Sequence, residues 1–507
     1  MTEQKQKISN QKLQLYPHQE ADVAALFERL AADTAGNRLL YQLPTGGGKT
    51  VVFAEISKRF LEQFQKKVLV LTHRLELCKQ TATMLKKLGV KNKVIDSSVK
   101  RLASNDANQC YVAMVQTLKN RIKDKLIKTE EIGLVIIDEA HHNSFHKLLN
   151  RFPNAKIIGV TATPLSCDSN RPLNKSYGEL IAGCGISDLI TRGYLSKPEV
   201  HSYDVEINTL QTGLNGDFTM TSSDELYGAP AMLNLLLQAY EAHAKGKKTL
   251  IFNNGVITSK KVQRVFTNAG YEIKHLDHKA SNAERNEILD WFKKKKNAIL
   301  TSVSILTTGF DEPTIKAIML NRATTSLSLY HQMIGRGART TRNKAKFTVI
   351  DLGNNIDRFG EWNAELDWQD IFQNPEAYRS AISNHSELHA MPSELRSLFP
   401  HSLELAFDVV AAYDTAIQQQ RKSKTVISDS IRQHALMCIE NAETVVEALS
   451  LADDLEKEID WRVKQYSKCL GNVTRSYTTW LQEEYKTKLK KMIQKLMHRN
   501  LQLQMVG

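Results

Sequence analysis

The amino-acid sequence predicts an α/β protein with two successive parallel-sheet domains and a mostly α-helical C-terminal domain. Short apolar runs alternate with helix-patterned segments in two separate blocks, and beyond Asn355 long helical stretches replace both. Buried parallel strands are near-continuous apolar runs, and each pair needs a crossover connection. At 507 residues the chain exceeds what one hydrophobic core normally serves, so we expect two or three domains.

The first block covers residues 13–200 and follows residues 1–12, which we expect to be flexible. Helical patterns such as Val51–Phe64 and Leu75–Leu88 separate its apolar runs. This alternation is typical of βαβ units with right-handed crossovers. The predicted strands are Arg38–Leu43, Lys67–Thr72, Cys110–Val115, Leu134–Asp138 and Ile157–Thr161.

The second block covers residues 231–355 and follows a polar segment, residues 201–230, that is typical of a linker because it is rich in Thr, Ser, Gly and Asn. This block has the size of another domain and shows the same alternation. Its predicted strands are Lys248–Phe252, Glu272–Leu276, Ala298–Thr301, Ala317–Leu320 and Phe347–Asp351.

Residues 356–507 are expected to form a helical accessory domain, with helices at Ser430–Leu451 and Thr478–Leu503. Residues 461–507 hold ten Lys or Arg and two Glu, a net charge of +8 out of the chain's +13. A basic helical tail is either a solvated helix face or a nucleic-acid contact, and the sequence favours neither.

The bulk composition restricts the class of partner. A net charge of +13 and a pI near 9.2 favour an acidic partner, either nucleic acid or an anionic membrane. No run approaches the ~20 apolar residues of a membrane span, and the N-terminus lacks an apolar stretch of signal-peptide length. The six scattered cysteines form no C-x-x-C pair, which indicates reduced thiols. We therefore expect a cytoplasmic protein without a membrane partner.

The sharpest motif is the phosphate-loop sequence Pro44–Thr50, which lies between a predicted strand and a predicted helix. Its glycines let backbone N–H groups turn toward phosphate oxygens, and the helix N-terminus adds a positive dipole. Lys49 can reach the β- and γ-phosphates, and Thr50 can ligate Mg²⁺. The alternative interpretation of this segment is a flexible glycine turn. The segment departs from the general pattern G-x-x-x-x-G-K-[ST] at its first position, where this chain has Leu43 in place of glycine. The predicted ATP-binding loop residues are Thr45, Gly46, Gly47, Gly48, Lys49 and Thr50.

An acidic pair follows Lys49 by 89 residues, at the C-terminal end of the apolar run Leu134–Asp138. Sheets of this class build their sites at that edge. Asp138 can hold Mg²⁺ through its water shell, and Glu139 can orient and deprotonate an attacking water. Taken without the phosphate loop, the same letters are also compatible with an ordinary helix start.

The histidines at positions 141, 142 and 146 raise the question of a zinc site. No cysteine or acidic cluster stands at metal-ligand spacing from them along the sequence. We therefore expect Mg²⁺ as the only metal, with ATP as the substrate, and no zinc.

Together these motifs resemble those of superfamily 2 helicases over residues 13–355, in the family's order. The matching segments are Leu15–Gln19, the phosphate loop, Leu71–Leu77, Val115–Leu118, Asp138–His141, Thr161–Pro164, Leu250–Phe252, Leu306–Asp311 and Gln332–Arg339. Within the superfamily, TTGFDEP followed by SLSLYHQMIGRGAR is most similar to the RadD-like helicases, relatives of the XPB group. The chain lacks the cysteine-rich zinc module that RadD-like proteins can carry.

The resemblance implies two RecA-like domains with ATP between them. Arg336 and Arg339 are then arginine fingers that face the γ-phosphate across the domain interface; otherwise they form surface salt bridges. Gln19 reads the adenine edge, and Tyr16 stacks on the base, although the subgroup usually has Arg at that position. The remaining implied roles are ATP contacts for Gly309 and Asp311, coupling for Thr161 and Thr163, and domain joining for His141 and Gln332.

The implied nucleic-acid contacts are made to phosphates by groups on both domains. The candidate residues are Arg74, Gln116, Thr117, Thr307 and Thr308. Each is also compatible with an ordinary loop or helix-cap position.

Three functions remain open at this stage: a DNA helicase or translocase, an RNA-directed motor, and a nucleic-acid binder that uses ATP as a clamp without unwinding. The third is disfavoured because all five groups expected for hydrolysis are present: Lys49, Asp138, Glu139, Arg336 and Arg339. We expect a monomer that acts on DNA, single-stranded or duplex with a single-stranded region, with RNA as the alternative.

Overall fold

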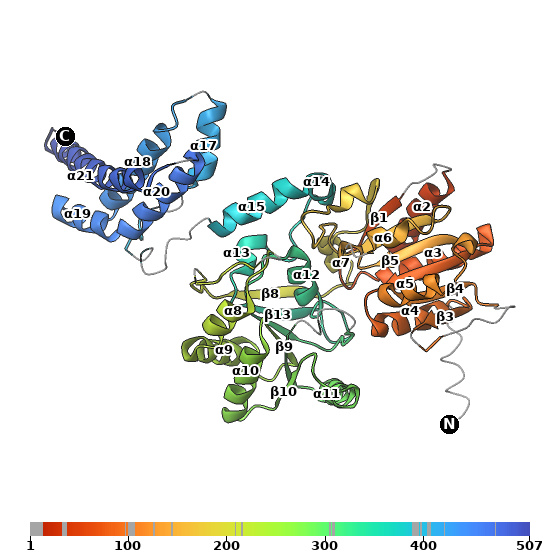
Figure 1. Ribbon diagram of the computed structural model, residues 1–507. Coiled ribbons are helices and arrows are strands. Elements are labelled where there is room, and N and C mark those ends of the chain that lie inside the picture. Colours follow the sequence, from red (N-terminus) through yellow and green to blue (C-terminus); the bar gives the residue numbers. More distant parts are fainter. Residues whose placement is uncertain are drawn as a thin grey trace. The chain divides into compact units, whose positions relative to one another are not determined.

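The computed structural model describes residues 14–506 with short gaps, at 33–37, 97, 100–106, 125–126, 143–144, 208, 214–215, 304–305, 307–309, 388–394, 396–397, 403–406, 420 and 472. The chain divides into two compact units, residues 1–379 and 380–507. Helices and strands are labelled as in Figure 1.

A seven-stranded parallel sheet forms the core of the first RecA-like domain. The strand order is β3-β4-β2-β5-β6-β1-β7. The strands are β1 (Arg38–Gln42), β2 (Lys67–Thr72), β3 (Asn92–Ile95), β4 (Cys110–Met114), β5 (Ile132–Asp138), β6 (Lys156–Thr161) and β7 (Glu179–Ala182). The five predicted strands are confirmed. Strands β3 and β7 were not predicted; they are short, only partly buried strands at the two edges of the sheet.

Helices cover both faces of this sheet because its strands are apolar on both sides. Val68 and Val70 of β2 belong to one core cluster, whereas Leu69 and Leu71 belong to the other. The helices are α2 (Pro17–Ala31), α3 (Lys49–Phe64), α4 (Leu75–Lys87), α5 (Val115–Lys123), α6 (His146–Leu149) and α7 (Ile186–Thr191). The two-sided burial explains why the strands are continuous apolar runs.

The second RecA-like domain is built on a six-stranded parallel sheet with the order β10-β11-β9-β12-β13-β8. Its strands are β8 (Lys197–Ser202), β9 (Thr249–Asn253), β10 (Ile273–Leu276), β11 (Ile299–Val303), β12 (Ala317–Asn321) and β13 (Lys346–Asp351). Its helices are α8 (Met220–Tyr227), α9 (Pro230–His243), α10 (Val256–Asn268), α11 (Asn282–Lys294), α12 (Leu327–Gly335) and α13 (Asn355–Phe359). The predicted fold class, two tandem parallel-sheet domains, is confirmed.

Strand β8 corrects one predicted boundary. It pairs along its whole length with β13, from Lys197 opposite Lys346 to Ser202 opposite Asp351. The sequence pattern places residues 197–200 at the end of the first domain and residues 201–202 at the start of the linker. The sequence gives little sign of the pairing because β8 is an edge strand with mostly polar, partly exposed residues.

Along the sequence, the first unit continues beyond the last strand of the second sheet and ends at residue 379. Helix α14 (Trp368–Gln373) packs on the first domain, where Phe372 joins the core and Gln369 Nε2 donates to the Leu180 carbonyl at 2.9 Å. Helix α15 (Pro375–Glu387) follows, and its Arg379 donates to the Ser166 carbonyl. The helical unit therefore begins later than residue 356, where the sequence pattern placed its start.

Five helices make up the described core of the second unit: α17 (Val409–Gln418), α18 (Thr425–Glu440), α19 (Val445–Asp454), α20 (Glu456–Leu470) and α21 (Arg475–Val506). Tyr485, Leu489 and Ile493 of α21 are fully buried against the other helices. The helix predicted at Ser430–Leu451 is instead two helices, because a capping box at Thr444 and Glu447 starts α19. Among the described residues, no helix has both the length and the apolar character needed to cross a membrane.

Candidate nucleotide-binding site

The phosphate loop connects β1 to α3. Gly46 and Gly48 have φ values of +91° and +96°, which side chains rarely adopt, and Gly48 is the residue before α3. Lys49 Nζ donates to the Leu43 carbonyl at 3.2 Å, inside the loop. Burial lowers the pKa of Lys49, while Glu139 and Asp138 oppose this shift. The structure therefore gives the predicted loop its expected form, with the half-buried Lys49 cation directed at the loop backbone.

The acidic pair lies at the C-terminal end of β5, two strands from β1 in the sheet order. Burial and the adjacent charge of Glu139 raise the pKa of Asp138 to about 7, and Lys49 opposes the rise. Burial also disfavours ionised Glu139, but nearby positive charges, among them Lys49 and Arg336, keep the pKa of Glu139 below its ordinary value. Glu139 has a φ of +54°, and its Oε2 is buried without a hydrogen bond from any described residue.

Of the two predicted adenine-binding residues, Gln19 contacts the phosphate loop directly and Tyr16 contacts Gln19. Gln19 is buried, accepts from the Tyr16 backbone N–H at 3.0 Å and donates to the Gly47 carbonyl at 3.2 Å. Tyr16 is 51% exposed, and its ring lies 4.4 Å from that of Tyr194. Tyr194 was not predicted, because it comes from the loop after α7 and lies 178 residues from Tyr16 along the chain. The two tyrosines form an aromatic surface beside the loop.

A chain of polar contacts runs from the acidic pair into the second domain. His141 Nδ1 lies 3.0 Å from Thr161 Oγ1, which donates to the Thr163 carbonyl at 2.8 Å. Thr163 in turn hydrogen-bonds Ser328 of α12. His141 Nε2 lies 3.4 Å from the Gln332 amide nitrogen, also on α12. The structure thus brings together all four predicted coupling and joining residues and adds Ser328.

The same contacts define the protonation of His141. Thr161 gives its only hydroxyl proton to Thr163, so His141 must donate from Nδ1 and accept at Nε2. Burial lowers the pKa of His141 to about 3, which keeps the imidazole neutral. A neutral ring with one defined tautomer can connect Glu139 to the second domain without adding a charge.

Both predicted arginine fingers lie at the domain interface. Arg336 is buried, donates to the Phe310 carbonyl at 2.7 Å, and lies within electrostatic reach of Glu139. Burial lowers the pKa of each of Arg336 and Arg339 to about 10, so both stay charged at neutral pH. Arg339 forms an ion pair with Asp311.

Close backbone packing fixes this approach of the two domains. A Cβ atom at Gly335 would lie 2.7 Å from Thr45 Cβ in the phosphate loop. The interdomain segment Tyr194–Lys197 adds a second link: Leu195 bridges Arg339, and Ser196 Oγ lies 3.2 Å from the Arg339 carbonyl. Leu195 also borders Gly46. This segment connects the aromatic surface, the phosphate loop and the arginine-bearing segment after α12, and it was not predicted.

Comparison with known proteins supplies the family. Residues 12–166 match the family model "Type III restriction enzyme, res subunit", and residues 231–341 match "Helicase conserved C-terminal domain". The matches fall on the two RecA-like domains in that order. The chain belongs to the superfamily 2 helicases. The finer placement beside the RadD-like and XPB proteins stays a prediction.

Two relatives and one solved structure illustrate the similarity. The "Putative ATP-dependent helicase IRC3" of Saccharomyces cerevisiae is 30% identical over 335 residues, which cover 62% of this chain and 48% of the relative. The "51.5 kDa protein" of a Lactococcus phage is 29% identical, covering 66% and 70%. A fragment of a "putative HsdR subunit of a type I restriction enzyme" from Vibrio vulnificus has a TM-score of 0.55 at 23% identity, over 68% of this chain and 65% of that one, and supports the fold alone. The helicase chain thus spans about half the length of the yeast relative.

The predicted nucleic-acid contacts of this helicase are only partly described. Arg74 precedes α4, and Gln116 and Thr117 lie in the first turn of α5, all at the C-terminal ends of strands. Thr307 and Thr308 lie outside the described residues, as does Gly309 of the predicted ATP site.

A polar crevice of about 390 Å³ separates α4 from α11 at the domain junction. Its lining includes the cations Lys79, Arg285 and Lys293, and Arg285 pairs with Glu76 at 3.6 Å. Burial lowers the pKa of Arg74, with Glu76 opposing and Arg285 adding to the shift, so Arg74 lies near this crevice.

The fold brings a cysteine to the histidines that the sequence left without a metal-ligand partner. His142 Nδ1 lies 3.9 Å from Cys167 Sγ, and with His141 three possible ligand atoms lie within 4.8 Å of one another. Spacing along the sequence did not indicate this group. Both nitrogens of His141 already face Thr161 and Gln332, so the group offers fewer ligands than the four of a structural zinc site. The absence of zinc stays a prediction.

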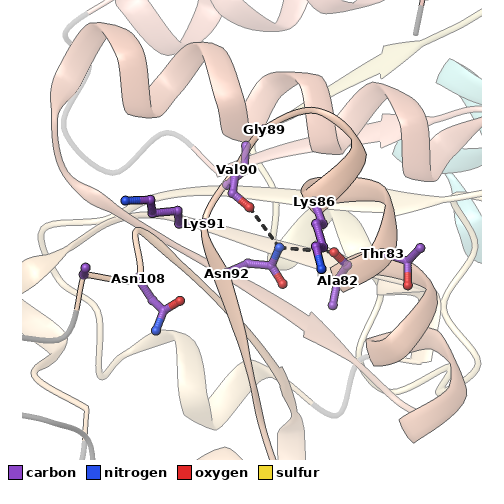
Figure 2. Close-up of a pocket in the computed structure, with 9 residues that line it drawn as sticks. Ala82, Thr83, Lys86, Gly89, Val90, Lys91, Asn92 and Asn108 are labelled. Carbon is purple, nitrogen blue, oxygen red and sulfur yellow. Dashed lines mark hydrogen bonds between the residues drawn. The ribbon is translucent and has the colours of Figure 1, made fainter. Parts of the chain in front are cut away.

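A second hollow lies at the N-terminal ends of strands β3 and β4, where α4 ends, and so away from the C-terminal strand ends that hold the predicted site. Figure 2 shows this hollow of about 520 Å³, with Asn92 donating to the carbonyls of Ala82 and Val90 at 3.1 and 3.0 Å. Its lining contains none of the predicted site residues that the structure describes. The helicase motifs instead converge on the C-terminal ends of the strands, as is usual for parallel sheets.

Proposed function

We propose that the chain hydrolyses ATP between its two RecA-like domains and couples hydrolysis to movement along, or separation of, DNA strands. The observation that carries this proposal is the gathering of Lys49, Glu139 and Arg336 within electrostatic reach of one another. One domain supplies the phosphate loop and a carboxylate, and the other supplies the cation. Because both half-sites belong to one chain, the proposed reaction needs no second copy.

In the proposed reaction a water oxygen bonds to the γ-phosphorus while the bond to the β,γ-bridging oxygen breaks, leaving ADP. Glu139 orients the water and takes its proton, and a pKa below its ordinary value keeps Glu139 ionised for this role. Lys49 and Arg336 stabilise negative charge on the phosphate oxygens as it redistributes. Tyr16 and Tyr194 offer an aromatic surface for the adenine.

Magnesium fits the oxygen groups beside the phosphate loop. Thr50 would provide a hydroxyl and Asp138 a carboxylate that acts through water, both oxygen ligands of the kind Mg²⁺ takes. Asp138 is buried beside Lys49, and Glu139 Oε2 is buried without a described hydrogen-bond donor. When bound, Mg²⁺ supplies positive charge to the phosphate oxygens.

The polar chain from Glu139 to α12 supports coupling between hydrolysis and domain movement. His141, Thr161 and Thr163 connect the acidic pair to Ser328 of the second domain. Loss of the γ-phosphate removes the negative charge that Lys49 and Arg336 both attract. We expect the two domains to separate at that point, which changes the spacing of nucleic-acid contacts on either side.

DNA is the proposed track. The net charge of +13 suits a polyanion, and the match to a model named for a restriction enzyme favours DNA over RNA. An RNA-directed motor and an ATP-gated clamp without unwinding are the alternatives. ATP hydrolysis by the full chain, measured without nucleic acid and with single-stranded DNA, duplex DNA or RNA, separates them. We expect the strongest stimulation by DNA; no stimulation by any of the three would contradict the motor.

Two substitutions test the assigned chemistry. Lys49→Ala and Glu139→Gln should each reduce ATP turnover by at least ~100-fold, since each removes a group that acts on the reacting phosphate. Glu139→Gln should still bind ATP because only water activation is lost, whereas Lys49→Ala should bind it weakly. Lys66→Ala and Glu62→Gln, at exposed positions on the same domain, are matched controls. Equal loss of nucleotide binding in both test variants would contradict the roles.

A further inference from the structure

Two aromatic side chains at the start of α21 are largely exposed. Trp480 is 54% exposed and Tyr477 is 38% exposed, with ring centroids 5.6 Å apart and planes inclined by 41°. The core of the helical unit is formed by another face of α21, which includes Leu481 and Tyr485. Exposing two large rings is unfavourable in water, so they are available to a ligand rather than needed by the core.

Neighbouring contacts place this aromatic pair beside α20 and the loop between α17 and α18. Thr478 Oγ1 donates to Ser467 Oγ of α20 at 3.4 Å. Tyr466, also on α20, donates from its hydroxyl to Ser423 Oγ at 3.3 Å and lies within electrostatic reach of Tyr477. The loop at Ser423 therefore lies at the same end of the unit as the exposed rings.

Exposed cations surround Ser423 and Tyr466 along the chain. Lys422 and Lys424 flank Ser423, and the exposed Lys464 lies one helical turn before Ser467, the residue that contacts Thr478. Within the described part of this unit, no carboxylate lies within ion-pair distance of these three lysines. Further along α21 the situation differs, because several lysines are neutralised internally. The pairs are Lys486–Glu456 at 2.6 Å, Lys488–Glu484 at 3.0 Å and Lys490–Asp453 at 2.6 Å.

We propose that Tyr477 and Trp480 form a stacking platform for the bases of single-stranded nucleic acid, with Lys422, Lys424 and Lys464 holding its phosphates. Aromatic faces and cations together are what sequence-tolerant single-strand binding requires. The two rings contact each other, so a base stacks on the exposed face of Trp480 and not between them. A duplex keeps its bases stacked inside and cannot use this surface in the same way.

The lysines also argue against a protein partner. Aromatic residues are enriched in the cores of protein interfaces, but lysine is depleted from them. This inference rests on the proposed function, since a strand-separating motor produces the single strand that the platform binds. It adds a contact in the helical unit, separate from the contacts expected on the RecA-like domains.

The test uses the full chain, a fluorescein-labelled oligo-dT strand and a labelled duplex of the same length. Trp480→Ala should weaken oligo-dT binding by roughly 5- to 150-fold, the equivalent of ~1 to 3 kcal/mol for a stacked base, and duplex binding by less than twofold. Trp480→Phe should restore most of the affinity because a ring remains. Val446→Ala, which truncates a 77% exposed apolar side chain of the same unit, is the matched control and should change neither.

Salt dependence separates stacking from charge. Trp480→Ala should leave the slope of log affinity against log salt unchanged, whereas the Lys422→Ala/Lys424→Ala double variant should make it shallower by about 1.4, two contacts at ~0.7 each. Equal loss for oligo-dT and duplex, or no rescue by Trp480→Phe, would overturn the platform. Unchanged affinity with altered thermal unfolding would also overturn it and assign the rings to packing. If single-stranded DNA still stimulates ATP hydrolysis, these outcomes contradict the platform but not the proposed motor function. If the wild-type chain does not bind DNA, both proposals are wrong.

Discussion

The domain interface of the first unit and the core of the helical unit each bury an arginine, Arg336 in the former and Arg462 in the latter. Arg462 is fully buried and donates to Glu458 at 2.8 Å, Ser430 at 3.0 Å and Gln433 at 2.6 Å. Arg336 donates to the Phe310 carbonyl at 2.7 Å and lies within electrostatic reach of Glu139 on the other domain, while burial lowers its pKa to about 10. The two guanidinium groups are similarly removed from water but have different surroundings.

The difference separates a structural charge from a functional one. Burying a cation is unfavourable unless it gains an anion or hydrogen bonds. Glu458, itself buried, supplies the anion for Arg462 within the same helix. Arg336 instead faces Glu139 of the other domain at the nucleotide site, so we expect its charge to act mainly on a bound phosphate. Substitution should therefore affect catalysis in one region and folding in the other.

The largest effect is expected at Arg336. Arg336→Ala should reduce ATP turnover by ~10³- to 10⁵-fold, the range for loss of an arginine finger, since Lys49 alone cannot neutralise the transition state. Thermal unfolding should change little, because the fold does not depend on this charge. The matched control is Arg342→Ala, which removes an exposed arginine six residues later. Unfolding at a much lower temperature with normal turnover per folded molecule would reverse the comparison.

A smaller effect, on stability, is expected at Arg462. Arg462→Ala should destabilise the helical unit by about 3–5 kcal/mol, because it leaves Glu458 as a buried charge without its partner. Replacing both residues, Glu458→Met and Arg462→Met, should recover most of that loss, since no charge then remains. Chemical denaturation followed by circular dichroism measures both variants. If the single variant is as stable as the wild type, Arg462 is not the structural charge that its contacts indicate.

The sequence predicts the part of the nucleotide site that is encoded locally. Gly46 and Gly48 permit the turns of the phosphate loop, and Asp138 ends an apolar strand, so both features are visible within a few residues. Tyr194 and Ser328 have no such signal, because their contacts with Tyr16 and Thr163 depend on segments more than 160 residues away. The contact of Thr163 with Ser328 is set by how the two domains pack, and that of Tyr16 with Tyr194 by the path of the loop after α7.

The same limit applies to the basic tail. Counting charges along residues 461–507 gives +8, but the count includes Arg462, which is buried in an ion pair. It also includes lysines neutralised by partners on α19 and α20, such as Lys490 with Asp453. The nucleic-acid surface proposed for this unit instead uses Lys422 and Lys424, which lie outside that segment. Charge in sequence and charge available to a ligand therefore differ.

A third buried cation, Lys344, extends the comparison. It is 4% exposed and donates to the carbonyls of Pro313 and Ile315 at 2.8 and 2.7 Å. Burial lowers its pKa to about 7, with Arg339 adding to the shift and Glu312 opposing it. An arginine in this position would stay charged, whereas a lysine can lose its proton and remain a donor to both carbonyls.

The smallest effect is therefore a pH dependence of stability. Between pH 7 and 10.5 the unfolded chain holds a proton on Lys344 that the folded chain has released, so the free energy of unfolding should rise with pH. One such group contributes at most about 1.4 kcal/mol per pH unit. Cysteines with raised pKa values, such as Cys110, make the free energy of unfolding fall with pH. The quantity to compare is therefore the free energy of unfolding of the wild type minus that of Lys344→Met at each pH. Urea denaturation at pH 7.5, 8.5 and 9.5 should show the wild type gaining stability relative to that variant; parallel curves would mean that Lys344 keeps its proton and is compensated like Arg462.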